Sequence, residues 1–193
     1  MRMLKPAAVL IAMLFAGFAA APANASATLQ MNLAQLVDNS ERIFVGTVVQ
    51  VTESRKAIGG GEIPAVTYRL KVNDTFKGAY EEIKGERFTD VTMLGSLKNL
   101  ASGKHPIADF PMLKVGTEYL LMVAPAGPIG LTSTMGLAQG CFHVQGTDAD
   151  KVVLNGVNNT GLFSNMNVGI EDGQPVSYGV LSSMITDLVG GAE

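Results

Sequence analysis

The stretch "YRLKVNDTFKG", residues 68–78, decides how the rest of this chain is interpreted. Apolar Tyr68, Leu70 and Val72 alternate with polar residues, and Gly78 follows as a turn. Because successive side chains of a strand point to opposite faces, the alternation predicts a strand with one face on a core and one in water. A strand of this kind belongs to an antiparallel sheet.

Two apolar stretches predict further strands of the same sheet: "RIFVGTVVQV", residues 42–51, and "LKVGTEYLLMV", residues 113–123. Gly46 interrupts the first, which is typical of a sharp bend at the corner of a small barrel. The second is apolar without alternation, which indicates protein on both faces. The expected core consists of Ile43, Val45, Val49, Tyr68, Leu70, Val72, Tyr119, Leu121 and Val123.

Helices are predicted near both ends. Asn32 is a good N-cap, and Gln35 stands at the capping-box position. Ser177 begins the second helix, in which Val180, Leu181, Met184, Ile185 and Leu188 form one apolar stripe. Residues 135–146, "MGLAQGCFHVQG", and 151–155 predict an added β-hairpin before that helix.

The first 25 residues have the pattern of a secretory signal peptide. A basic start precedes an apolar run over residues 7–21, and Ala23-Asn24-Ala25 supplies a cleavage site. That run is shorter than the ~20 residues that span a bilayer. We therefore expect cleavage after Ala25, a secreted or periplasmic location, and no membrane span afterwards. Residues 26–193 then form a single β-barrel domain, with the hairpin and helix as an extension from about residue 130.

The charge and the cysteine content restrict which partners and which disulfides are possible. The formal net charge is −3 without basic clusters, which argues against nucleic acid as a partner. Cys141 is the only cysteine, so no internal disulfide can form. It is either a buried small hydrophobe or the site of a disulfide between chains, and the sequence leaves the oligomeric state open.

Three phrases, "SERIFVGTVVQV", "YRLKVNDTFKG" and "LKVGTEYLLMV", together resemble the netrin-like module. This is the OB-type barrel also found in tissue inhibitors of metalloproteinases. With "AQGCFHV", residues 138–144, they are also similar to a group of uncharacterised exported bacterial proteins. The resemblance implies a small OB-like barrel. Those inhibitors present an N-terminal cysteine to the enzyme's zinc, whereas Ser26 is the expected terminus here, so that contact does not carry over.

Few residues of this sequence are candidates for catalysis or for metal binding. Cys141 and His143 are predicted to share one face of a strand, where they could bind copper or zinc, although two ligands are too few. His105 is interpreted as a solvated loop residue. No Gly-x-Ser-x-Gly, His-Glu-x-x-His, phosphate-loop or dinucleotide motif occurs, so we assign no catalytic residue and no cofactor.

Two functions remain open at this stage. The first is a non-catalytic, inhibitor-like binding module that recognises an envelope or extracellular protein through loops 57–64 and 94–112. The triple glycine at 59–61 would make the first of these loops flexible. The alternative is a metal-handling protein or hydrolase centred on Cys141 and His143.

Overall fold

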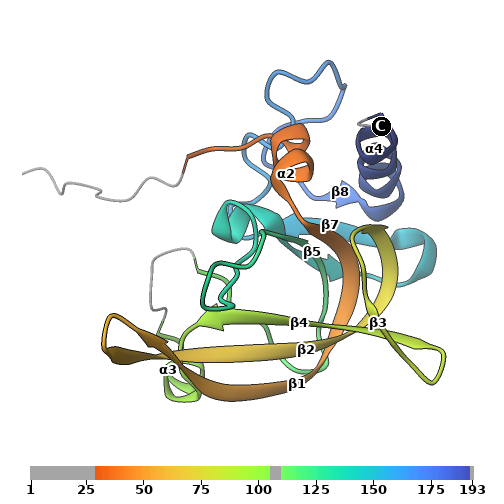
Figure 1. Cartoon of the computed structure of the whole chain (residues 1–193). Helices are drawn as coiled ribbons and strands as arrows, with labels where there is room; N and C mark the ends of the chain where they lie inside the picture. The colour runs from red at the N-terminus through yellow and green to blue at the C-terminus, as the bar shows by residue number, and fades with distance from the viewer. Residues whose placement is uncertain (1–28, 105–109, 192–193) are drawn as a thin grey trace, which may run out of the picture.

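The computed structural model describes residues 29–104 and 110–191 (Figure 1). The signal-peptide prediction and His105 therefore lie outside the described residues. The elements follow one another in the order α2 (Leu33–Asn39), β1 (Arg42–Ile58), β2 (Gly61–Lys77), β3 (Glu81–Ile83), β4 (Glu86–Leu94), α3 (Leu97–Ser102), β5 (Glu118–Val123), η1 (Leu137–Gly140), β6 (Cys141–Gln145), η2 (Asp148–Asp150), β7 (Val152–Asn155), β8 (Val176–Ser177) and α4 (Tyr178–Gly190).

In the described residues, one antiparallel sheet of eight strands dominates, in the order β3-β4-β2-β1-β5-β6-β7-β8. The prediction of a mainly β protein with helices near both ends is confirmed. The predicted closed barrel is not confirmed, because edge strands β3 and β8 do not pair with each other in the described chain. Loop residues connect β4 to the end of β5: the Thr132 amide donates to the Thr92 carbonyl (2.8 Å), and Thr134 bridges to Val123.

The longest feature is the hairpin of β1 and β2, 17 residues each. It turns at Gly59 and Gly60, whose φ angles of 56° and 79° suit a tight two-residue turn. The ladder runs up to the pair Ile58 and Gly61. The predicted flexible loop at 57–64 is therefore wrong, because backbone pairing continues to the turn itself.

The β1–β2 ladder has three register shifts in the near half of β1: between Ile43 and Phe44, between Val45 and Gly46, and between Val48 and Gln50. At Gly46, a Cβ atom would lie 2.9 Å from the Lys71 carbonyl oxygen, so the close approach of β2 requires glycine there. Val49 is an extra residue between the pairs that Val48 and Gln50 make with β2. This bulge interrupts the alternation and leaves Val49 44 % exposed, so its predicted place in the core is wrong.

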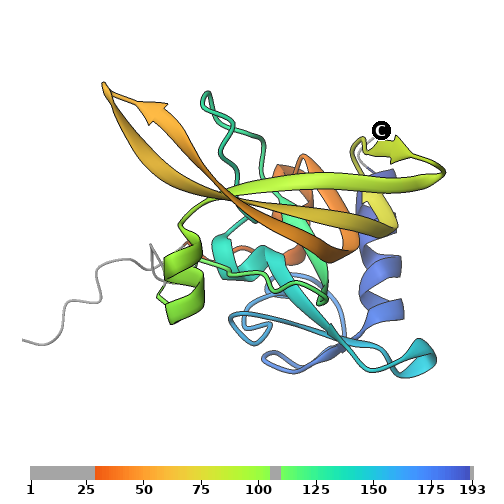
Figure 2. The ribbon, with the colours of Figure 1, turned by 90° about the horizontal axis from the view of Figure 1, so that it is seen from below.

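The core consists of two clusters on opposite faces of the sheet. The helix-side core joins Ile43 and Val45 to residues of α2, α4, β5, β6 and β7. The inner core joins Tyr68, Leu70 and residues of β1, β4, β5 and β6 on the other face. Figures 1 and 2 show α2 and α4 side by side over the first of these faces. β5 is buried against both clusters, as predicted from its continuous apolar run.

The terminal helices largely match their predictions. Asn32 and Gln35 form the capping box, each side chain accepting from the other's backbone amide at 3.0 Å. In α4, Leu181 and Ile185 are fully buried, whereas Val180 is 46 % exposed and does not belong to the buried stripe. None of the described helices is long and apolar enough to cross a membrane.

The predicted second hairpin is present, but its first strand is shorter than predicted. β6 begins at Cys141 and pairs with β7, in agreement with the prediction for residues 151–155. Residues 137–140 instead form a 3₁₀ turn, which Leu137 enters with a φ of 56°. Gly140 passes so close to the Met135 backbone that a side chain has no room. The strand therefore cannot extend back to residue 135.

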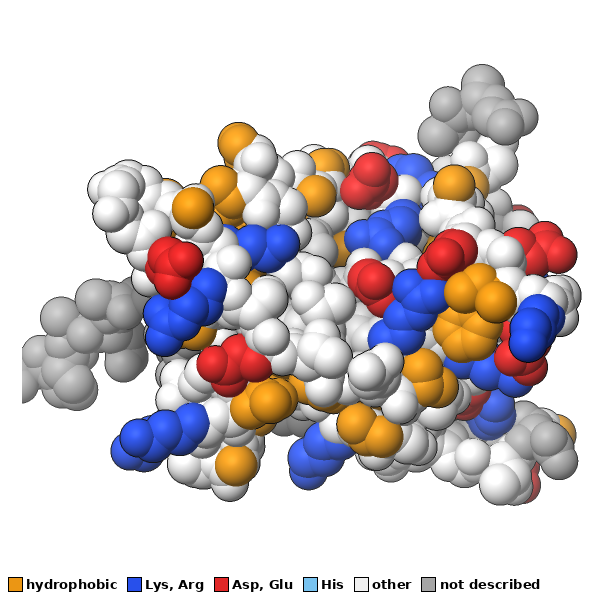
Figure 3. Space-filling view, turned by 60° about the horizontal axis from the view of Figure 1, so that its bottom comes forward, with side chains coloured by type: hydrophobic (Ala, Val, Ile, Leu, Met, Phe, Trp, Pro, Cys, Tyr) orange, Lys and Arg blue, Asp and Glu red, His pale blue; other side chains and the backbone are white. Residues whose placement is uncertain are grey.

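The outer face of β2 and β4 carries paired charges. Arg69 binds Asp90 at 3.1 Å and also contacts Glu81, and Lys71 pairs with Glu86. Figure 3 shows acidic and basic side chains intermingled on this side of the molecule. Because these pairs are largely solvated, they contribute little to stability, and they leave no single-sign patch here.

Candidate functional site

A hollow of about 800 Å³ opens beside α3, and we call it the α3 hollow. Its wall is mostly apolar and comes from α3, residues 110–114 and the start of β6. The polar side chains in its described lining are Lys114 and His143. Small-molecule and side-chain binding sites in proteins have a similar size and a similar mixture of apolar wall and few polar groups.

Two buried tyrosines fix the segment that forms one wall. The Tyr119 hydroxyl accepts a hydrogen bond from the Lys114 amide at 3.1 Å. The Tyr68 hydroxyl forms a hydrogen bond with the backbone of Leu113. Burial raises the pKa of Tyr68 to about 12, so its hydroxyl stays protonated. Tyr68, from the opening stretch of the sequence, therefore holds this segment against the inner core as well as filling that core.

The opposite wall depends on α3. Ser96 caps this helix by accepting from the Asn99 amide at 3.2 Å, and Gly103 ends it with a φ of 66°. The Leu97 amide donates to Glu53 of β1 at 2.6 Å, which ties the helix to the long hairpin. Part of the predicted long loop 94–112 is thus a short helix that is bonded to β1. The sequence pattern does not predict this helix, because the two prolines of the segment favour a loop.

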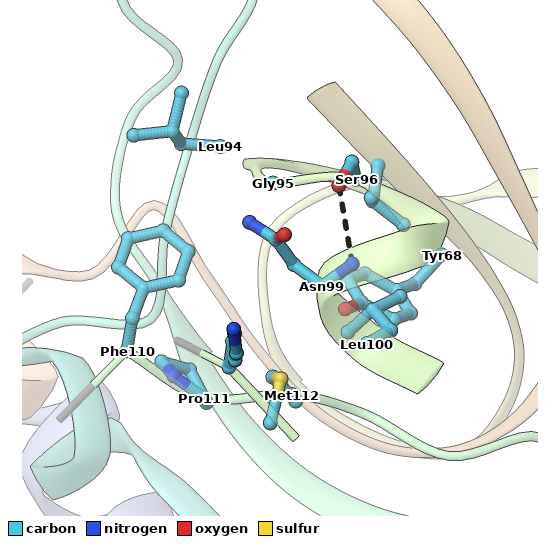
Figure 4. Close-up of a pocket in the computed structure, with 11 residues that line it drawn as sticks. Tyr68, Leu94, Gly95, Ser96, Asn99, Leu100, Phe110, Pro111 and Met112 are labelled. Carbon is cyan, nitrogen blue, oxygen red and sulfur yellow. Dashed lines mark hydrogen bonds between the residues drawn. The ribbon is translucent and has the colours of Figure 1, made fainter. Parts of the chain in front are cut away.

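A second, much smaller cavity of about 10 Å³ also borders residues 110–112 and is lined in addition by the end of β4 and by α3. Figure 4 shows the Asn99 side chain directed toward the space between it and the Phe110 ring. This volume corresponds to roughly one water molecule. The cavity is therefore a packing space under α3, and the α3 hollow is the larger of the two candidate sites.

Cys141 and His143 do lie on one face of β6, as predicted, and both border the α3 hollow. Phe142, between them, points into the helix-side core. The His143 ring packs on Tyr119, with the ring centroids 4.9 Å apart. Sequence spacing therefore placed the pair correctly.

The electrostatics of the pair disfavour nucleophilic chemistry. Cys141 is only 4 % exposed, and burial raises the pKa of its thiol to about 12. The thiolate, which is the nucleophile and the metal ligand, is therefore scarce at neutral pH. Burial and, second, the charge of Lys114 lower the pKa of His143, so its imidazole is neutral. Over residues 29–104 and 110–191, no group of three His, Cys, Asp or Glu residues could hold a metal ion.

Sequence reasoning missed a buried polar network behind the hollow. Gln139 accepts from the Met31 amide (2.8 Å) and donates to the Leu29 carbonyl (3.0 Å). Asn155 donates to the Gln139 carbonyl and accepts from the Asn159 amide. These bonds attach the start of the described chain to the loop after β7. The only available signal is Gln139 between two small residues in "AQGCFHV", a phrase whose pattern predicts a strand.

Of the two loops predicted to contact a partner, one borders the α3 hollow and the other does not. Residues of loop 94–112 line the α3 hollow, whereas the described lining contains no residue of 57–64. The segment 57–64 is the tip of the β1–β2 hairpin.

Searches of this sequence against protein-family models and against curated proteins found no match.

Proposed function

We propose that this protein is an exported, non-catalytic and inhibitor-like binding module of the OB-type, netrin-like class. In this proposal the α3 hollow receives an apolar side chain of a partner protein in the bacterial envelope or outside the cell. The observation that carries the proposal is the hollow itself: about 800 Å³, apolar walls and an exposed lysine at its edge.

The charge at the hollow favours a particular partner chemistry. Lys114 is the charged side chain of the described lining, and His143 is neutral. An apolar residue next to a carboxylate, on Asp, Glu or a chain terminus, would satisfy both the wall and Lys114. The bond from the Thr132 amide to the Thr92 carbonyl of β4 connects the two ends of a curled sheet, and this supports the OB-type proposal, since a curled sheet is common to that class.

The test fills the hollow without disturbing the core. Ala101 lies exposed on α3 and borders the hollow, whereas Lys98 lies exposed on the same helix outside the described lining. Envelope and secreted fractions are passed over the immobilised mature protein and over the variants Ala101→Trp, Lys98→Trp and Lys114→Glu. We expect a specific partner to be retained by the parent and by Lys98→Trp, and lost with the other two.

Two outcomes would overturn the proposal. Equal retention by Ala101→Trp and Lys98→Trp would show that binding does not use the α3 hollow. Hydrolytic or redox turnover that disappears with Cys141→Ala or His143→Ala would instead favour the alternative function centred on those two residues.

A further inference from the structure

The far half of β1 has an open edge. β1 pairs with β2 up to Ile58, but its ladder with β5 ends at Thr47. The last hydrogen bonds on that edge join Val48 to Gly116 (2.8 Å) and Thr117 (3.1 Å). Beyond Val48, the described part of the chain makes no backbone–backbone hydrogen bond to this edge, although the Glu53 side chain accepts from the Leu97 amide of α3. Figure 2 shows the hairpin projecting from the body of the molecule.

An open edge of this length is a template for pairing with another strand. Residues 50–58, "QVTESRKAI", contain no proline, and none of their pairs with β2 shows a register shift. The bulge at Val49 lies just before this segment and separates it from the part of β1 that pairs with β5. The edge therefore lacks two of the usual devices that block strand addition, proline and an internal bulge.

The sequence of this edge is complementary to itself in one register. When two copies pair in antiparallel fashion about a two-fold axis perpendicular to the sheet, opposite side chains must lie on the same face. With Ser54 on the axis, Glu53 of each copy lies opposite Arg55 of the other. This arrangement forms two attractive cross-strand pairs.

Neighbouring registers are disfavoured by the same two residues. The nearest shifts that keep the faces matched place Glu53 opposite Glu53, or Arg55 opposite Arg55. Like charges directly opposite each other destabilise a strand pair. The register centred on Ser54 also places Val51 opposite Ala57, so that small apolar side chains meet.

One feature of the monomer agrees with this register. The Arg55 side chain is 62 % exposed and pairs with Glu62 only at 3.9 Å, so it remains available. We propose that a second copy of this chain pairs with the β1 edge at residues 50–58, antiparallel, with Ser54 at the two-fold axis.

The first experiment measures self-association by sedimentation velocity over ~1–300 μM, because a single strand pair buries less surface than a stable interface usually does. We expect the parent to dimerise with increasing concentration. Arg55→Glu should weaken dimerisation ~10-fold or more, since two attractive pairs become repulsive. Glu53→Arg should do the same, and the double variant should restore the dimer.

Arg55→Glu is the cleaner of the two single variants, because Glu53 also accepts from Leu97 of α3. Glu82→Arg, an exposed charge reversal on β3, serves as the matched control and should leave dimerisation unchanged. A parent that stays monomeric throughout, or a double variant no better than the single ones, would overturn the proposal.

The second experiment tests the register directly. Opposite residues of an antiparallel pair have Cβ atoms ~4.5–5.5 Å apart, close to the separation that a disulfide bridges. Under mild oxidation Ser54→Cys should form a disulfide-linked dimer. Thr52→Cys should not, because Lys56 would lie opposite it, and neither should the parent, whose Cys141 is buried. Equal cross-linking of the two variants, or none, would exclude the register.

Discussion

The two halves of β1 pair with the same strand, yet they differ in what covers them. In residues 42–48, Ile43 and Val45 pack under the helices while Phe44 and Val48 enter the inner core, all at most 3 % exposed. In residues 49–58, Val49 and Ile58 are 44 % and 50 % exposed. Backbone pairing with β2 is continuous through both halves apart from the bulges. The far half of β1 therefore buries fewer side chains than the near half, and it is held by its ladder, by Val51 at the margin of the inner core and by the bond from Leu97 to Glu53.

The largest effect that tests this comparison is expected at Phe44. Its ring is fully buried and packs edge-on against Tyr80, with centroids 5.6 Å apart. Phe44→Ala should lower the free energy of unfolding by ~3–5 kcal/mol, through lost burial and the cavity left behind. Ile58→Ala, on the far half, should change it by less than ~0.5 kcal/mol. Urea denaturation of both variants measures the difference, and similar losses would show that the far half is part of the core.

A smaller effect is expected from matched glycine substitutions. In Gly46→Ala, the new methyl group would lie 2.9 Å from the Lys71 carbonyl oxygen, which should cost ~1–3 kcal/mol. In Gly61→Ala, the nearest neighbour is the Ile58 carbonyl at 3.8 Å, so the change should stay within ~0.5 kcal/mol. Thermal unfolding of the two variants provides the comparison. A tolerated Gly46→Ala would mean that β1 is not pressed against β2 at that point.

The smallest effect concerns alkaline pH and the inner core. Burial raises the pKa of the Cys141 thiol from 9.0 to about 12, so the unfolded chain loses this proton at lower pH than the folded protein does. The stability is therefore complete below pH 9 and falls as the pH rises towards 12. We expect the thiol to contribute a loss of ~1 kcal/mol in the parent between about pH 8 and pH 10.

Cys141→Ala isolates that contribution. The variant should be less stable at every pH, but its stability should fall less steeply above pH 9 than that of the parent. Burial also raises the pKa values of Tyr68, Tyr80 and Tyr178 to about 12, so these tyrosines contribute in the same direction and account for a remaining slope. Identical slopes for parent and variant, measured by urea denaturation, would mean that the thiol is accessible to water in the folded protein.

Most of the segments that form the candidate site could be identified from the sequence, each one separately. Alternation in β6 placed Cys141 and His143 on one face, because a period of two is a local property of any strand. Loop 94–112 was identified by its length and prolines, although the Ser96 and Gly103 caps of α3 were not. The hollow itself could not be predicted, because it arises where α3, residues 110–114 and β6 meet.

The sequence by itself determined the elements whose signals are local: the Asn32–Gln35 capping box, the alternating strand at Tyr68 and the continuously apolar β5. Each depends on the geometry of a few neighbouring residues. Only the tertiary structure decided that Ile43 and Tyr68 belong to different cores and that a bulge exposes Val49. It also decided that Gln139 binds the start of the described chain. These features follow from contacts between residues far apart in the sequence, and periodicity along the chain does not encode them.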